Sequence, residues 1–166
     1  MDNGQPKLRV FVDANILVSG IVWPRWPYEI LQMAIRGEYR LVLSDYVFAA
    51  APCIIRNRFF EQANQFESFL AQCDFETVAD PNAELVQIHR SLMRDIADVP
   101  IALAAIEAQV DCMVSEDKDF AADDDSTIEL HQQLAVYLSG TFLREMMGWS
   151  TEQLEAVRGR TWRYLR

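Results

Sequence analysis

The sequence contains few of the residues that proteins use to hold zinc or to form disulfides. It has three cysteines, Cys53, Cys73 and Cys112, and no two of them form a Cys-x-x-Cys pair. Its two histidines, His89 and His131, are far apart along the chain. These residues exclude zinc-ribbon and thioredoxin-type sites and leave no histidine pair at ligand spacing. Isolated cysteines in an odd number also predict a reduced, cytoplasmic protein.

Long apolar segments are absent as well. No run approaches the roughly 20 apolar residues that a membrane-spanning helix requires. The first six residues are mostly polar and lack the apolar core of a secretory signal. We therefore expect no membrane partner.

Positively charged residues are few. The chain has 15 lysines and arginines and 25 aspartates and glutamates, which gives a net charge of −10. An acidic surface repels phosphate, which argues against a protein that coats nucleic acid without sequence preference. A nuclease is not excluded, because a cluster of carboxylates adds to the negative count and bound divalent cations offset it locally.

What is present is an alternation of short apolar runs with segments of helical periodicity. The 166 residues favour one domain, spanning residues 8–166 and including C-terminal helices, after a disordered segment at residues 1–7. Strands are predicted at residues 8–12, 40–44, 75–78, 112–114 and 134–138. Helices are predicted at residues 28–36, 45–72 with a break near Pro52, 83–94 and 100–109, and two more at the end. This alternation predicts βαβ units and a mainly parallel sheet.

Several aspartates follow predicted strands or begin a predicted helix. Asp13 ends the first strand, Asp117 and Asp119 follow the strand at residues 112–114, and Asp98, preceded by Asp95, opens a helix. Sites in open α/β sheets form beyond the carboxyl ends of the strands, so these acids are expected to gather at one edge. Gathered carboxylates repel one another, and Mg²⁺ or Mn²⁺ would relieve that repulsion. The pattern favours hard-metal phosphodiester chemistry.

Each aspartate also has a purely structural interpretation. Asp13 could close a turn with Asn15 at the end of the strand, and Asp98 could serve only as a helix cap before Pro100. Asp117 and Asp119 could be ordinary loop charges.

Three segments, in this order, resemble the motifs of PIN-domain proteins: Val10–Gly20, Asp98–Ala105 and Asp111–Phe120. The resemblance covers about residues 8–145 and is greatest to the toxin components of bacterial toxin–antitoxin pairs. It implies a three-layer α/β/α sandwich and a Mg²⁺- or Mn²⁺-dependent ribonuclease. In such an enzyme Asp13, Asp98 and Asp117 would hold the metal, Asp119 would assist, and Asn15 and Ser115 would orient ligands or water. The resemblance also implies RNA as substrate, an antitoxin protein as partner, and a homodimer.

One position departs from the family pattern. The family has a glutamate early in the helix after the second strand, and the matching residue here is Ala50. Asp45 or Glu116 could replace the missing ligand. The alternative is a catalytically weakened PIN-like module that binds a protein or RNA partner. A haloacid dehalogenase-like phosphotransferase, with Asp13 as nucleophile, fits less well because Asn15 stands where that family has a second aspartate.

Overall fold

Five parallel strands form the centre of the molecule. A computed structural model describes residues 6–165. The strands lie in the order β3-β2-β1-β4-β5, and every pairing between neighbours is parallel. Their bounds are β1 Arg9–Val12, β2 Arg40–Ser44, β3 Phe75–Val78, β4 Cys112–Val114 and β5 Val136–Tyr137. Of the predicted 1–7 segment, residues 1–5 lie outside the described residues.

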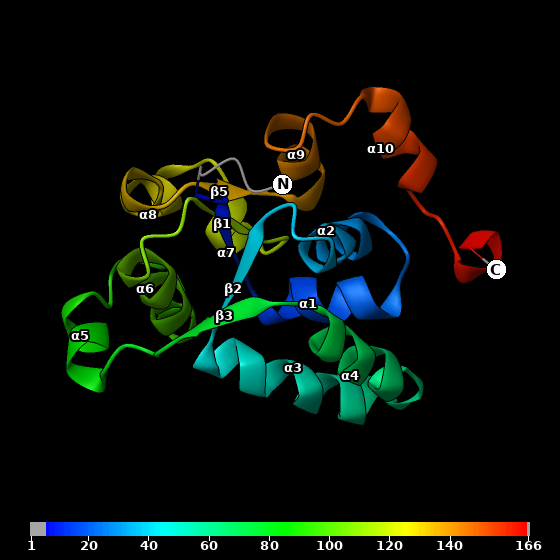
Figure 1. Ribbon diagram of the computed structural model, residues 1–166. Helices are drawn as coiled ribbons and strands as arrows, with labels where there is room; N and C mark the ends of the chain where they lie inside the picture. The colour runs from blue at the N-terminus through cyan, green and yellow to red at the C-terminus, as the bar shows by residue number, and fades with distance from the viewer. Residues whose placement is uncertain (1–5, 166) are drawn as a thin grey trace.

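Helices flank the sheet on both sides (Figure 1), which confirms the predicted three-layer α/β/α architecture. In that view α5 and α6 lie to the left of the strands, α1 and α2 to the right, and α3 with α4 below. The helices are α1 Ala14–Val22, α2 Trp26–Ile35, α3 Asp45–Arg58, α4 Ala63–Gln72, α5 Ala83–Ile88, α6 Val99–Glu107, α7 Lys118–Ala121, α8 Ile128–Gln133, α9 Ser139–Glu145 and α10 Thr151–Val157.

The central strands are apolar because both of their faces are covered. Val10, Phe11 and Val12 of β1 are fully buried, as are all three residues of β4. Parallel sheets with helices on both faces have such continuous apolar strands rather than alternating ones. The short strands can therefore be recognised from composition alone.

Two predicted helix boundaries were wrong. The helix predicted at residues 45–72 is broken, but not near Pro52: α3 continues through this proline to Arg58, and α4 begins at Ala63 after a 3-10 turn at Phe60–Gln62. The inward face of α3 carries Val47, Ala51 and Ile55 at four-residue spacing, and all three are buried. Their packing outweighs the hydrogen bond that the proline removes. The helix predicted at 83–94 ends at Ile88.

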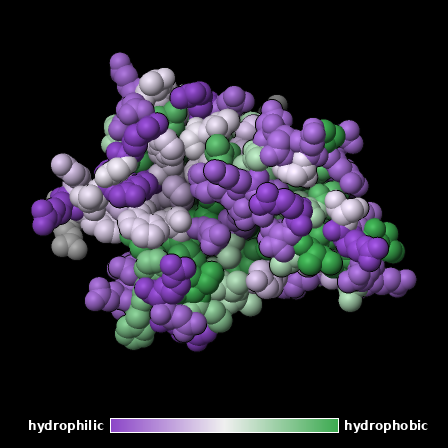
Figure 2. All heavy atoms as spheres, turned by 180° about the vertical axis from the view of Figure 1, so that it is seen from behind, coloured by the Kyte–Doolittle hydropathy of each residue, from purple (hydrophilic) through white to green (hydrophobic). Residues whose placement is uncertain are grey.

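The face shown in Figure 2 is largely hydrophilic, with apolar side chains gathered in a few places. Large exposed apolar residues include Tyr46, Phe48 and Phe60 on α3 and the turn that follows it, and Ile88 and Ile96 near α5. Among the described residues, no helix is long and apolar enough to cross a membrane.

Candidate metal centre

The strand order places a crevice between β1 and β4. From β1 the chain adds β2 and β3 on one side, whereas β4 and β5 lie on the other. The direction of winding therefore reverses between β1 and β4, which is where open α/β sheets bind ligands. Asp13 directly follows β1, and Ser115 directly follows β4.

Asp13 is held in place by two hydrogen bonds. Its Oδ1 accepts a bond of 3.0 Å from the backbone N–H of Ile16, which caps α1. Its Oδ2 accepts a bond of 2.5 Å from the hydroxyl of Ser115. Burial raises the pKa of Asp13 to about 6, although the two hydrogen bonds act in the opposite direction. Asp13 thus caps α1, a role that was not predicted for it, and also presents a buried carboxylate to the crevice.

Ser115 joins the ends of the two strands. While its hydroxyl donates to Asp13, its Oγ accepts a bond of 3.1 Å from the N–H of Asp117. Asp117 in turn caps α7 and accepts a bond of 2.9 Å from the N–H of Asp119. The loop after β4 is therefore fixed relative to Asp13 by side-chain hydrogen bonds.

Asp98 approaches from a third segment, at the start of α6. Its side chain makes no capping hydrogen bond, so the cap-only interpretation has no support in the geometry. Burial raises the pKa of Asp98 to about 6, and the negative charges of Asp117, Asp95 and Asp119 contribute to the same shift. The carboxylate is thus close enough to the other acids to sense their charge.

These side chains meet at a cavity of about 190 Å³. Asp13, Asn15, Asp98 and Asp117 all line it, whereas Ser115 and Asp119 do not. Ser115 instead lies behind Asp13, which agrees with the supporting position predicted for it. The structure thus brings together three carboxylates from three separate segments of the chain.

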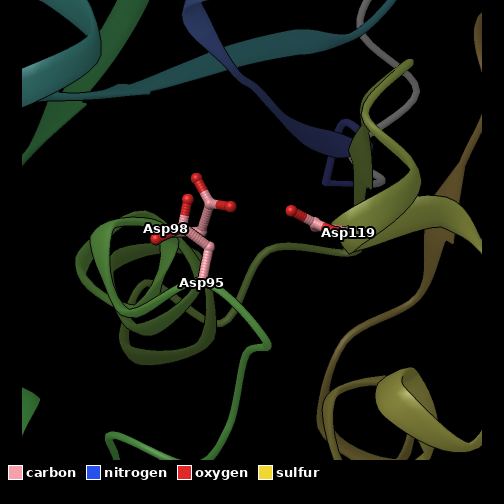
Figure 3. Close-up of side chains that lie close together, drawn as sticks. All are labelled: Asp95, Asp98 and Asp119. Carbon is pink, nitrogen blue, oxygen red and sulfur yellow. The ribbon is translucent and has the colours of Figure 1, made fainter.

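Asp119 belongs to a second group of acids beside the cavity. Asp95, Asp98 and Asp119 each have a carboxylate oxygen within 4.8 Å of the others. Figure 3 shows Asp95 and Asp98 together in the turn before α6, with Asp119 facing them from α7. Asp119 also forms an ion pair of 3.0 Å with Arg94. Asp95 was not predicted as a site residue, although its spacing of three from Asp98 at a helix start was a usable signal.

The donor set fits a hard divalent cation. All of the acids offer carboxylate oxygens, which are the ligands that Mg²⁺ and Mn²⁺ prefer. The raised pKa values of Asp13 and Asp98 reflect burial and mutual repulsion, and a bound cation would offset both. Histidine and cysteine side chains do not line this cavity.

Ala50 also lines the cavity, together with Tyr46 from the same helix. The position at which the sequence resemblance implies a glutamate therefore faces the acids but carries a methyl group. Neither predicted replacement lines this cavity. Glu116 accepts a bond of 2.9 Å from the N–H of Ser139, and Asp45 is an exposed residue at the start of α3.

The fold and the site define an α/β protein with a carboxylate cluster at the switch point of a parallel sheet. A PIN-domain family model matches residues 9–119, more than half of the chain. The chain belongs to the PIN-domain family.

Two solved structures share this fold at low sequence identity. PAE2754 from Pyrobaculum aerophilum superposes with a TM-score of 0.56 at 16% identity, covering 86% of this chain and 91% of that chain. VapBC2 from Rickettsia felis, bound to a DNA fragment from its promoter, gives a TM-score of 0.55 at 15% identity and covers 79% and 98%. No curated protein matches the chain in sequence.

Proposed function

We propose that the protein is a Mg²⁺- or Mn²⁺-dependent endoribonuclease and serves as the toxin of a bacterial toxin–antitoxin pair. The observation that carries the proposal is the meeting of Asp13, Asp98 and Asp117 at one cavity beyond the ends of β1 and β4. Membership of the PIN-domain family supports a nuclease. The fold shared with VapBC2 of Rickettsia felis supports an antitoxin partner.

Each residue has a defined part in the proposed reaction. Asp13, Asp98 and Asp117 hold the divalent cation, which when bound activates water and offsets the charge on a phosphate oxygen. Ser115 fixes the orientation of Asp13 through the 2.5 Å hydrogen bond. Asn15, exposed at the cavity, offers an amide to a phosphate oxygen or to water. Asp119 lies beside Asp98 and assists the three carboxylates. The reaction requires no covalent enzyme intermediate.

A second function is favoured by one observation, namely Ala50 at the cavity wall. With one carboxylate fewer than the resemblance implies, the site would bind a cation more weakly. The protein would then act as a PIN-like module that binds RNA or a protein partner without cleaving RNA.

RNA cleavage separates the two functions. End-labelled single-stranded RNA is incubated with the protein and Mn²⁺, Mg²⁺ or EDTA, beside Asp13→Asn and the control Asp124→Asn from the exposed acidic loop. We expect metal-dependent cleavage by wild type and the control, and none by Asp13→Asn. A folded wild-type protein that cleaves with neither metal would leave the binding module as the function.

A further inference from the structure

A second cavity lies near the proposed catalytic one, on the other side of the loop after β4. It has a volume of about 350 Å³, within the usual range for ligand pockets. Its lining includes Trp23 at the end of α1, Trp26 and Pro27 at the start of α2, Ser139 from α9, Glu116, Arg25 and Arg158. Two aromatic rings therefore surround a small number of polar groups, which is the usual composition of a ligand site.

Two polar groups in this cavity have unused hydrogen-bonding capacity. The Oγ of Ser139 is buried and has no partner among residues 6–165. Glu116 uses Oε1 to accept from the Ser139 N–H, while Oε2 makes no hydrogen bond within the described chain. No lysine or arginine of the described chain lies within ion-pair distance of this carboxylate. Buried polar atoms are normally paired with protein or water, so the unpaired Ser139 hydroxyl leaves a polar group in the wall of this cavity.

The aromatic part of the cavity is rigidly placed. The indole N–H of Trp26 donates a bond of 3.0 Å to the carbonyl of Leu154. The guanidinium of Arg158 lies over the same ring, 5.3 Å from its centroid. Trp23 is 40% exposed and packs edge-on against Phe59 at 5.5 Å. Arg158 thus lies over one face of Trp26, and Trp23 keeps part of its surface exposed to the cavity.

The cavity also lies close to the proposed catalytic cluster. Glu116 is the residue between Ser115 and Asp117, and consecutive Cα atoms are about 3.8 Å apart. Ser115 and Asp117 face the acids, whereas Glu116 faces α9. An RNA strand could therefore present a phosphodiester to the acids while a neighbouring base enters this cavity.

We propose that this cavity binds a guanine base of the RNA substrate and gives the proposed nuclease its base preference. Guanine offers two adjacent N–H donors on its Watson–Crick edge, and a carboxylate such as Glu116 can accept from both. The other RNA bases lack this pair of donors. The Ser139 N–H holds the Glu116 carboxylate in place, and Trp23 offers an aromatic face for stacking. Arg25 and Arg158 disfavour a basic side chain as occupant because they already place positive charge at the cavity.

The proposal rests on the proposed function for its role in RNA cleavage, but base binding can be measured without any cleavage. GMP, IMP, AMP, CMP and UMP are titrated against the full chain by calorimetry and tryptophan fluorescence, without metal. The expected preference for GMP over AMP is roughly 10- to 100-fold, the range of a good bidentate contact to a base. IMP, which lacks the exocyclic amine, should bind at an intermediate level.

Two variants test the carboxylate itself. Glu116→Gln keeps an acceptor for the Ser139 N–H, so it should fold, yet it should lose the preference for GMP. Glu155→Gln, next to Arg158 but outside this cavity, should keep that preference. Equal binding of the five nucleotides, or a GMP preference unchanged in Glu116→Gln, would overturn the proposal. So would tighter binding of N-acetyl-arginine amide than of GMP, which would mark a site for a protein side chain. GMP binding in a protein that cleaves no RNA would contradict the proposed nuclease and leave the base site intact.

Discussion

At the scale of single residues, burial strongly alters the Asp13 carboxylate. Only 5% of Asp13 is exposed, and burial raises its pKa to about 6. A carboxyl whose pKa is raised by folding binds a proton more tightly in the folded chain than in the unfolded chain. It therefore stabilises the fold below about pH 4, and this contribution is lost as the pH rises to 6.

Replacing Asp13 by asparagine should remove this pH dependence. With metal chelated, we expect Asp13→Asn to gain stability relative to wild type between pH 4 and pH 7, by about 3 kcal/mol for a shift of about two pKa units. Urea unfolding of both proteins across this pH range measures the difference. Stability profiles that run parallel would show that Asp13 titrates at its ordinary pKa.

The hydrogen bond from the Ser115 hydroxyl to Asp13 is expected to contribute more to stability and to Mn²⁺ binding than an exposed serine–aspartate hydrogen bond does. Ser115→Ala removes a donor from a buried carboxylate, which typically costs about 1–3 kcal/mol of unfolding free energy. It should also weaken Mn²⁺ binding, since the pKa of Asp13 would rise further and its orientation would be lost.

A matched control exists on the surface. Ser126 makes a similar hydrogen bond of 2.5 Å to Asp124, but that bond is exposed to solvent. Ser126→Ala should therefore change stability little and leave Mn²⁺ binding unchanged, as measured by urea unfolding and calorimetry. Equal losses in the two variants would show that the buried Ser115 contact has no special role.

The sequence predicted the site residues whose position follows from the end of a strand. It did not predict those whose place depends on the direction of a side chain. Asp13 and Asp117 follow apolar strands, so the rule for parallel sheets placed them correctly at one edge. The separation of Glu116 from this cluster was not predictable, because one residue in a loop decides which side of the sheet a carboxylate faces. The Arg94–Asp119 ion pair also depends on tertiary placement.

At the scale of elements, α3 decides whether the acid cluster is complete. The helix places Tyr46, Ala50 and Ile54, at four-residue spacing, along the cavity wall. Ala50→Glu should therefore add a carboxylate to the cluster and tighten Mn²⁺ binding by roughly tenfold, since affinity follows the number of charged ligands. Calorimetric titration measures the change.

The neighbouring alanine supplies the control. Ala49 is exposed on the same helix and does not line the cavity. Ala49→Glu adds the same charge and should leave Mn²⁺ affinity within a fewfold of wild type. Matching gains in both variants would mean that net charge, and not position on α3, sets the affinity.

Element types were predicted better than element ends. The strands at residues 40–44, 75–78 and 112–114 were confirmed at those bounds, because apolar β-formers bounded by polar residues mark them clearly. The continuation of α3 through Pro52 could not be predicted, because it depends on the packing of Val47, Ala51 and Ile55 against other parts of the fold.

At the scale of the whole molecule, the exposed apolar residues of α3 and its following turn predict a homodimer. Tyr46 and Phe48 are 54% and 38% exposed, and Phe60 is 75% exposed. The segment at residues 139–149 is a poorer interface, because Phe142 and Leu143 of α9 are buried in the core. Large exposed apolar side chains mark protein interfaces where they gather on one surface.

Phe60→Asp should convert the predicted dimer into a monomer, because a buried, unpaired charge at an interface is costly. Light scattering after size-exclusion chromatography measures the mass. Ile88→Asp changes an equally apolar, 67% exposed residue away from this surface and should leave the dimer intact. A wild-type protein that is already a monomer would contradict the prediction.

The central claim is that the carboxylates at the switch point hold a divalent cation, and calorimetric titration of Mn²⁺ into the purified protein tests it most directly. Wild type should bind Mn²⁺ at pH 7.5, Asp98→Asn should bind it at least tenfold more weakly, and Asp124→Asn should match wild type. Binding should weaken as the pH falls through 6, because protons compete for Asp13 and Asp98. A folded wild-type protein that takes up no Mn²⁺, or an Asp98→Asn variant that binds it unchanged, would contradict the claim.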